Sequence, residues 1–459
     1  MWPRGIRWQT VPLFLTLGAC HPAYQRPPRV PTAQKAVAET AINGPLPLFV
    51  VNGSPFCFQG ANNYYLHYKS RAAVTAVLDA ARAMSLPVVR SWAFLDRGAL
   101  DGSVANAKDS GEKEGVYFQY WDVEKNRPAY NDGPTGLEKL DVLLHEARAR
   151  DLRLILVLTN NWRDFGGIDQ YLIWYGLTKH YEFYTDPRVR SAYKDWVAHL
   201  INRVNSVDGV PYKEDPAIFS WELANEPRAG NFESFDSPLG WNDNTIATWA
   251  AEMSAFIKTL DHNHMVSVGD EGFLPGSGTD PVFPLGPGID GEALSAIPTV
   301  DFGTYHLYPD HWLTSDAWGT EWIERHLSLG RRLQKPMLLE EYGTRVARRP
   351  GNPGAIESGE DRRRVAYGRW NQTIRNGGGP GALFWMLAAE DAPGHRYPDY
   401  DHFTIYPGDE GALLTRLASQ MQVETEACIT ARGHQFAKSP FVRTALGPGS
   451  GPPRLAQVD

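Results

Sequence analysis

The apolar positions of the chain fall into eight runs of strand length that alternate with segments of helical periodicity. The runs are rich in Val, Ile, Leu and Phe, as strands buried on both faces are. They lie at residues 58–62, 86–92, 152–160, 217–225, 265–270, 300–306, 336–342 and 381–387. The helical pattern covers residues 71–84, 137–150, 188–207, 245–260, 321–333 and 361–376. Strands that alternate with helices predict a parallel sheet, and eight of them predict a single (β/α)8 TIM barrel of the α/β class.

Turn residues and long polar stretches predict how these elements are connected. Asn52-Gly53, between two short apolar runs, predicts a β-hairpin over residues 46–58. Two connections are long, residues 93–136 after the second strand and residues 271–299 after the fifth. Both follow the carboxyl ends of strands, where barrels of this class hold their sites. We therefore expect long loops at the C-terminal face to shape a cleft.

The amino-terminal residues have the pattern of an export signal. Arg4 and Arg7 precede a short apolar stretch at residues 11–17, which is too short to span a bilayer permanently. Leu-Gly-Ala-Cys then ends at Cys20 and is similar to a bacterial lipobox, in which the cysteine is lipidated. The alternative is ordinary cleavage with Cys20 unmodified. Either way we expect an exported protein, whose membrane contact is limited to a lipid anchor.

The remaining composition divides the chain and excludes some partners. We expect a signal peptide at residues 1–20, a Pro-rich tether at 21–45, the catalytic barrel at 46–440 and a disordered tail at 441–459. The net charge of −8, without a basic stripe, is evidence against a nucleic-acid partner. Cys57 and Cys428 are compatible with a disulfide or with two thiols.

Three kinds of chemistry lack their sequence patterns. No cluster of Cys or His residues has the spacing of metal ligands, so we expect no metal. The GxGxxG match at residues 286–291 contains Pro287 and lacks the strand-to-helix context of a dinucleotide site, so we expect no cofactor. The GxSxG elbow of an esterase is absent as well.

Carboxyl groups stand at the ends of two of the predicted strands. The fourth apolar run ends in Asn225-Glu226-Pro227, and the seventh ends in Glu340-Glu341. Two acids at one barrel mouth predict the carboxyl pair that cleaves a glycosidic bond. Any single strand-end acid is more often a helix cap or an ion-pair partner. The alternating pleat means that only one of Glu340 and Glu341 faces the cleft, and the pattern alone leaves that choice open.

Other strand ends carry polar and aromatic residues that suit the same site. Arg90 and Trp92 end the second strand, and Arg90 is suited to hold a carboxylate ionised, although a plain buried ion pair has the same pattern. His306 and Tyr308 end the sixth strand and suit hydrogen bonds to an acid or a sugar, or a satisfied core. Trp385 ends the eighth strand, either as a sugar platform or as packing.

Together these motifs make the chain resemble glycoside hydrolase family 5, and within it the β-mannanase branch, over about residues 58–390. The motifs are Gly60-Ala61-Asn62-Asn63-Tyr64-Tyr65, Val89-Arg90-Ser91-Trp92-Ala93-Phe94, Thr159-Asn160-Asn161-Trp162-Arg163-Asp164-Phe165-Gly166-Gly167, Trp221-Glu222-Leu223-Ala224-Asn225-Glu226-Pro227, His306-Leu307-Tyr308-Pro309-Asp310-His311-Trp312 and Glu340-Glu341-Tyr342-Gly343. The resemblance implies a retaining double displacement, with Glu226 as acid/base and Glu341 as nucleophile.

The resemblance also implies supporting residues around the two acids. Arg90 and Tyr308 would hold the nucleophile, and Asn225 would contact the 2-hydroxyl. His306 would line the catalytic centre, and Trp385 would form the floor of the subsite at the cleaved bond. Trp92 and Trp162 would contact the substrate. For the two acids we expect a raised pKa on Glu226, a lowered pKa on Glu341 and a separation of about 5–5.5 Å.

The expected activity is hydrolysis of β-1,4-mannosidic bonds in mannan or mannooligosaccharides, by an endo-acting enzyme. The long loops leave open an exo-acting β-mannosidase, because extra walls would close one end of a groove. An endo-β-1,4-glucanase of the same family shares the catalytic residues. A catalytically inactive carbohydrate-binding barrel is the alternative outside enzymes, and the presence of both acids with Asn225 and Arg90 is evidence against it.

Overall fold

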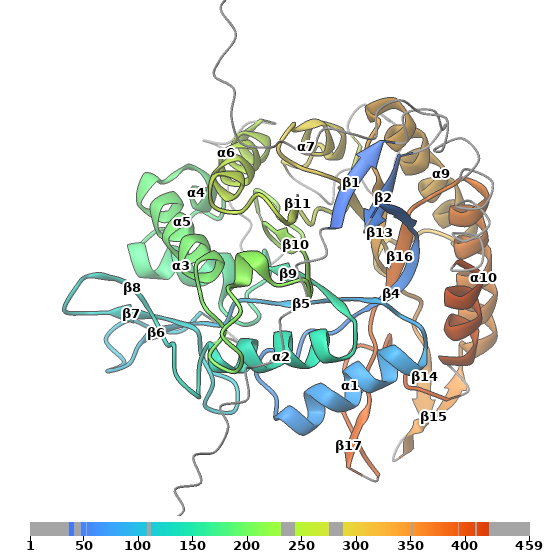
Figure 1. The fold of residues 1–459 in the computed structure, drawn as a ribbon, viewed down its shortest axis with the longest axis horizontal. Coiled ribbons are helices and arrows are strands. Elements are labelled where there is room, and N and C mark those ends of the chain that lie inside the picture. Colours follow the sequence, from blue (N-terminus) through green and yellow to red (C-terminus); the bar gives the residue numbers. More distant parts are fainter. Residues whose placement is uncertain are drawn as a thin grey trace, which may run out of the picture. The chain divides into compact units, whose positions relative to one another are not determined.

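Eight parallel strands form the central sheet, as the apolar runs predict (Figure 1). The computed structural model describes residues 36–40, 47–51, 53–107, 112–230, 244–274, 288–349, 352–392, 394–408 and 411–421. The strands are β4 (Phe58–Asn62), β5 (Val88–Trp92), β9 (Arg153–Val157), β10 (Ile218–Glu222), β11 (Met265–Ser267), β12 (Gly303–Leu307), β13 (Met337–Tyr342) and β16 (Gly381–Phe384). Their order, β11-β10-β9-β5-β4-β16-β13-β12, begins and ends with strands that are consecutive in this series, as in a barrel. The predicted (β/α)8 fold is confirmed.

Helices alternate with these strands along the chain. They are α1 (Arg71–Ala83), α2 (Glu138–Ala149), α3 (Gly167–Tyr175), α4 (Glu182–Thr185), α5 (Pro187–Ile201), α6 (Thr245–Leu260), α7 (Gly291–Ala296), α8 (Pro309–Trp312), α9 (Asp316–Leu333) and α10 (Glu360–Asn376). Side-chain caps set several starts: the Ser70 hydroxyl accepts from Ala73 N at 3.3 Å, and the Asp186 carboxylate caps α5 one residue before its proline. The six predicted helices correspond to α1, α2, α5, α6, α9 and α10.

The amino ends of the barrel strands enclose an apolar core. It consists of Phe49, Phe58, Val88, Ile155, Phe219, Met265, Phe302, Leu338 and Leu383. Phe49 comes from β2 (Pro47–Val51), and its ring centroid lies 5.1 Å from that of Phe219 and 5.2 Å from that of Phe302. Because this end of the barrel is filled with apolar side chains, the polar strand-end residues can meet only at the carboxyl end.

The predicted amino-terminal hairpin is present and carries one extra strand. β2 pairs antiparallel with β3 (Ser54–Phe56) around the predicted turn. β1 (Ala36–Thr40) pairs with the other edge of β2, within the segment expected to be a tether. The unpaired edge of a hairpin offers backbone hydrogen-bonding groups that an extended neighbouring segment satisfies.

Several short elements were not predicted from sequence. Residues 93–136 contain the sheet of β6 (Asp96–Ala99), β7 (Gln119–Asp122) and β8 (Arg127–Tyr130). Two small hairpins follow later strands: β14 (Ala347–Arg349) with β15 (Asn352–Ser358), and β17 (Glu390–Ala392) with β18 (His395–Arg396). A 3-10 turn also covers Tyr212–Glu214. Such elements are too short to show a clear apolar periodicity.

Some predictions fall outside the described residues. Cys20, Cys428, residues 441–459 and the start of the glycine motif at residues 286–291 are among them. Lipidation of Cys20 therefore stays a prediction, and the choice between a disulfide and two thiols for Cys57 and Cys428 stays open. Within the ranges that the structure describes, we find no helix with the length and apolarity needed to cross a bilayer.

Candidate active site

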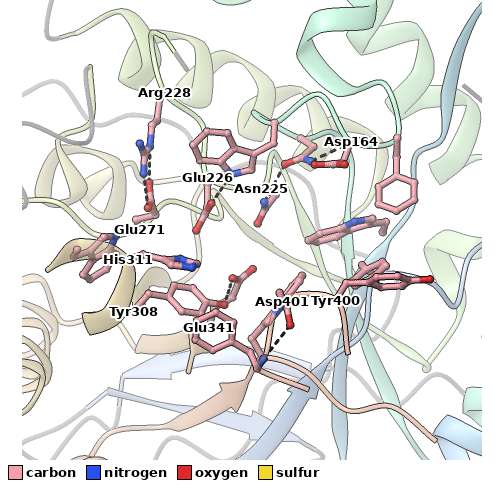
Figure 2. Close-up of a pocket in the computed structure, with 18 residues that line it drawn as sticks. Asp164, Asn225, Glu226, Arg228, Glu271, Tyr308, His311, Glu341, Tyr400 and Asp401 are labelled. Carbon is pink, nitrogen blue, oxygen red and sulfur yellow. Dashed lines mark hydrogen bonds and ion pairs between the residues drawn. The ribbon is translucent and has the colours of Figure 1, made fainter. Parts of the chain in front are cut away.

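A cleft of about 870 Å³ opens where the barrel strands end (Figure 2). Seven of the residues predicted from sequence line it: Trp92, Trp162, Asn225, Glu226, Tyr308, Glu341 and Trp385. Arg90 and His306 are fully buried and contact the two predicted acids directly. The fold thus brings together every predicted substrate-site residue.

Glu226 follows β10 in a backbone conformation that few residues other than glycine adopt. Its φ is +48°, in the left-handed region. Its N–H donates to the Gly269 carbonyl at 2.8 Å, and Pro227 prevents the strand from continuing. This turn directs the Glu226 carboxyl into the cleft, opposite Glu341 (Figure 2). Strained non-glycine residues of this kind concentrate at functional sites.

Both carboxyl oxygens of Glu226 have partners on other strands or loops. Oε1 lies 2.7 Å from Nδ1 of His306 on β12. Oε2 accepts a hydrogen bond from the Trp162 indole N–H at 2.6 Å. Trp162 therefore contacts one of the two acids directly, and the pair of partners fixes the orientation of the Glu226 carboxyl.

Glu341 is held by two donors at the end of β13. Its Oε1 accepts from Nη1 of Arg90, and its Oε2 accepts from the Tyr308 hydroxyl at 2.7 Å. Only 4% of Glu341 is exposed. A carboxylate that accepts charged and neutral hydrogen bonds on both oxygens is fixed in one orientation.

Arg90 connects the Glu341 carboxylate to the rest of the strand ends. Its Nη2 donates to Asn225 Oδ1 at 2.7 Å and to Glu222 Oε1 at 2.6 Å. Its Nε donates to Glu222 Oε2 at 3.0 Å, and its Nη1 donates to Asn62 Oδ1 at 3.1 Å. The rigid guanidinium fork thereby ties four strands into one network.

A β-bulge in β13 changes the expected alternation of Glu340 and Glu341. Tyr305 pairs with Leu339, whereas His306 pairs with Glu341, so Glu340 is the extra residue. Glu341 lines the cleft and Glu340 does not, as expected of two neighbours. However, the prediction from alternating pleats is wrong in its reason, because Glu340 also points inward: its Oε2 lies 3.7 Å from Arg90 Nε.

The two acids are close enough for one sugar carbon to lie between them. One oxygen of Glu226, one oxygen of Glu341 and a ring nitrogen of His306 all lie within 4.8 Å of one another. Retaining glycosidases have carboxyl separations of about 5–5.5 Å and inverting ones about 6.5–9.5 Å, so this spacing fits the retaining class. By spacing alone the three atoms could also hold a metal ion, which the sequence did not indicate because they come from three separate strands.

The predicted order of the two pKa values is wrong for the protein without substrate. Burial opposes ionisation of Glu226, but the hydrogen bond and charge of His306, with Arg228 and Trp162, lower its pKa to about 2. Burial raises the pKa of Glu341 above its ordinary value, against the opposing charges of His306 and Arg90. Burial disfavours the charged form of His306, yet the surrounding carboxylates raise its pKa well above the ordinary value. These directions favour a proton on His306 over one on its partner Glu226.

Aromatic side chains form one wall of the cleft. The Trp385 ring lies 6.0 Å from that of Trp92 and stacks at 5.9 Å on that of Tyr64. Its indole N–H donates to Asp401 Oδ2 at 2.7 Å. The neighbouring Tyr400 is 70% exposed, so its ring reaches the rim of the cleft. Flat faces with polar edges suit the two faces of a sugar ring.

The described residues of the two long loops that the sequence indicated supply little of the cleft wall. No described residue of 93–136 lines the cleft, and of the described residues of 271–299 only Glu271 does. The prediction that both loops shape the cleft is wrong for 93–136, because those residues form the separate β6-β7-β8 sheet. Residues after the eighth strand, Tyr400, Asp401 and Phe403, supply a wall instead.

Sequence reasoning assigned no role to eleven further residues that line the cleft, although six of them stand within the quoted motifs. They are Tyr64, Asn160, Asp164, Phe165, Arg228, Glu271, His311, Trp312, Tyr400, Asp401 and Phe403. Asn160 and Glu271 stand at the ends of predicted strands, so the rule that identified Glu226 would have included them. Glu271 accepts two hydrogen bonds from Arg228, at 2.7 and 2.6 Å, and burial raises its pKa to about 7. Tyr400 and Asp401 carry no strand-end signal.

Comparisons with known proteins match this geometry. Residues 46–368 match the family model described as "GH family 5 beta-mannosidase-like". The chain is 36% identical over 365 residues to a mannan endo-1,4-beta-mannosidase A of Podospora anserina, covering 78% of this chain and 85% of the relative. An endo-1,4-beta-mannanase of Rhizomucor miehei shares 34% identity and a TM-score of 0.72, over 82% of this chain and 98% of that one.

A thermostable relative has the same barrel. The endo-1,4-beta-D-mannanase of Thermotoga petrophila is 38% identical, with a TM-score of 0.65, over 80% of this chain and 100% of that one. The matched regions contain the strand ends that carry Glu226 and Glu341. The chain belongs to glycoside hydrolase family 5, in its β-mannosidase-like group.

Proposed function

We propose that the protein is a retaining endo-β-1,4-mannanase. The observation that carries this proposal is the pair of carboxyls from β10 and β13, facing each other across an open cleft within 4.8 Å. The relatives named as endo-mannanases cover most of this chain, which favours mannan over cellulose and endo over exo action. The mechanism follows from which atoms hold the proton and which carry the negative charge.

In the first step Glu341 attacks the anomeric carbon. Its carboxylate forms a covalent bond to that carbon while the bond to the leaving sugar oxygen breaks, and the proton of the Glu226–His306 pair passes to that oxygen through Glu226. In the second step Glu226 takes a proton from a water molecule. The water oxygen forms a bond to the anomeric carbon, and the bond from that carbon to Glu341 breaks. Two inversions leave the product with the configuration of the substrate.

The supporting residues fit this sequence of events. Arg90 and Tyr308 stabilise the charged form of Glu341 that must attack. Asn225, held by Arg90 and by the Asn160 amide contact at 2.9 Å, presents a polar group to the 2-hydroxyl. Trp385 and Trp92 provide the apolar floor beneath the sugar at the cleaved bond, and Trp162 orients Glu226.

Product analysis tests both the linkage and the mode of attack. On β-1,4-linked mannohexaose we expect oligomers of several lengths from the first minutes, because an open cleft accepts chains on both sides of the cut. Proton NMR of the fresh products should show the β-anomer first. Single mannose units from the start would instead establish an exo-mannosidase, an α-anomer an inverting enzyme, and faster cutting of cello-oligosaccharides a glucanase.

The pH profile should report where the catalytic proton resides. Glu341 must be ionised, so its raised pKa places the acid limb of kcat/KM above the ordinary glutamate value of about 4.3. Activity is lost at high pH when the Glu226–His306 pair gives up its proton. In His306→Asn only Glu226 can hold that proton, so the alkaline limb should move to lower pH.

The exposed residue His262 provides a matched control for this prediction. His262→Asn should leave both limbs of the kcat/KM profile where they are in the unchanged protein. An alkaline limb that stays in place in His306→Asn would show that the proton is held elsewhere.

For location, we propose that the chain is exported and anchored by lipid at Cys20. The basic residues, short apolar stretch and Leu-Gly-Ala-Cys pattern support this. An enzyme that acts on a polymer too large to enter a cell must meet its substrate outside.

A further inference from the structure

Beneath the two facing acids lies a second layer of charge with no contact to solvent. Arg90, Glu222 and Glu340 are each 0% exposed. Glu222 and Arg90 share close hydrogen bonds at 2.6 and 3.0 Å. Glu340 has no such bond: in the described part of the chain, neither of its oxygens has a hydrogen-bond partner. Burying a carboxyl group without a hydrogen-bond partner costs free energy, so the presence of Glu340 at this position needs a reason.

The position of Glu340 connects the two halves of the site. Its Oε2 lies 3.7 Å from Arg90 Nε and 3.7 Å from His306 Nε2. Arg90 holds the Glu341 carboxylate from its other side, and His306 holds Glu226 through Nδ1. His306 Nε2 is itself buried without a hydrogen-bond partner among the described residues, so Glu340 is the carboxyl that faces it.

A purely structural ion pair does not explain this arrangement. Glu222 already engages Arg90 through three hydrogen bonds, so Arg90 does not need Glu340 as its counter-charge. The β-bulge that makes Glu340 point inward is also the register change that sets Glu341 beside His306. Bulges of this kind redirect side chains next to active sites.

We propose that Glu340 is a positioning residue: its buried carboxyl group faces both Arg90 and His306, and so holds the nucleophile and the acid/base in place at the same time. This role rests on the proposed retaining function. Glu340 touches neither the cleft nor the substrate, so it acts only through the two cationic side chains.

The carboxyl groups around His306 determine how far the loss of Glu340 changes the pKa of His306. His306 is faced by Glu226 after β10, by Glu340 and Glu341 on β13, and by Asp270 and Glu271 after β11. Burial opposes ionisation of Glu340, but Arg90 and His306 lower its pKa, whereas burial raises the pKa of Glu222 well above its ordinary value. Glu340 therefore faces both Arg90 and His306, whereas Glu222 is held by Arg90.

The two neighbouring acids give a matched pair of variants. Glu340→Gln removes a charge, so we expect the alkaline limb of kcat/KM to move by about one unit to lower pH and kcat to fall at least about tenfold, with KM unchanged. Glu222→Gln changes an acid that is held by Arg90 rather than by His306, so its alkaline limb should move less than that of Glu340→Gln. Glu340→Asp keeps the carboxyl group, so the alkaline limb of kcat/KM should stay close to its position in the unchanged protein.

NMR of the imidazole tests the inference without substrate. In protein labelled with ¹⁵N-histidine, with the His306 signals assigned from His306→Asn, both ring nitrogens should carry protons near about pH 7. In Glu340→Gln the loss of that proton should move to lower pH, and in Glu222→Gln it should move less. If Glu340→Gln does not fold, a neutral His306 ring near that pH in the unchanged protein, or in Glu340→Asp, would overturn the inference.

The remaining outcomes are also decisive. Equal shifts of the alkaline limb in Glu340→Gln and Glu222→Gln, or a Glu340→Gln enzyme within about twofold of full activity with an unshifted limb, would refute the positioning role. Failure of the proposed function has a different signature, because the unchanged protein would then not cut mannan at all. The NMR titration of His306 would still test whether Glu340 affects the pKa of His306.

Discussion

Replacing Glu341 by Gln is expected to lower kcat on mannan at least about 10⁴-fold, with little change in KM. Gln has nearly the shape of Glu: its carbonyl oxygen can accept from Arg90 and its NH2 can donate to the Tyr308 hydroxyl oxygen, so the substrate should bind as before. The amide cannot form the covalent bond to the anomeric carbon, however. Rates on soluble mannan, together with thermal unfolding to check the fold, measure the effect.

Chemical rescue turns this loss into a test of each role. Glu341→Ala leaves space on one side of the sugar, so added azide should restore cleavage of an activated aryl β-mannoside and give the α-mannosyl azide by a single inversion. Glu226→Ala retains the nucleophile, so azide should attack the covalent intermediate and give the β-mannosyl azide. Interchanged products would reverse the assignment of the two acids.

The surface residue Glu292 supplies the control for an acid-to-amide change. In the described structure it forms an ion pair with exposed Arg332, and neither residue lines the cleft. Glu292→Gln should keep full activity. Retention of more than about one hundredth of the activity in Glu341→Gln would exclude this residue as the nucleophile.

Replacing Arg90 by Ala is expected to remove activity and to lower the free energy of unfolding by about 3–5 kcal/mol at neutral pH. Arg90 is fully buried and donates to Glu222, Glu341, Asn225 and Asn62. Its loss leaves acidic groups in a site with less opposing charge. Urea unfolding followed by tryptophan fluorescence measures this loss.

The pH dependence of that loss follows from the sign of the charges. Without Arg90 the pKa values of Glu222 and Glu341 rise further, because burial is then opposed by fewer positive charges. The groups take up protons as the pH falls, so the difference from the unchanged protein should shrink at acid pH. A constant difference at all pH values would show that lost packing, and not unbalanced charge, causes the destabilisation.

Arg90→Lys separates charge from geometry. Lysine keeps the positive charge but cannot direct donors to several acceptors at once as the guanidinium does. We expect most of the stability to return, while kcat stays at least about tenfold low because Glu341 loses its fixed orientation. Full recovery of kcat would show that charge alone is required.

Much of the site could be predicted because its key residues stand at strand ends. Glu226, Glu341, Arg90, His306 and Trp385 each end an apolar run, and a parallel barrel brings all such ends to one face. Trp162 is in a loop, and only the resemblance to known enzymes indicated it. Tyr400 and Asp401 follow the last strand and carry no pattern that places them beside the cleft.

The tertiary structure corrected two expectations for physical reasons. Alternation within one strand predicts opposite directions for Glu340 and Glu341, but a bulge, which depends on pairing with β12, makes both contact Arg90. The role of general acid led us to expect a raised pKa on Glu226, but that pKa depends on every charge nearby, and His306 lowers it instead.

The sequence by itself determined the barrel, the face on which the site lies, Glu226 and the pair Glu340-Glu341, because strand length, periodicity and strand-end chemistry are local properties of the chain. The choice of Glu341 came from the resemblance to family 5. Only the tertiary structure decided the walls of the cleft, the inward turn of Glu340 and the location of the catalytic proton. These depend on distances between residues far apart in sequence, and electrostatic interactions between buried groups are set by such distances.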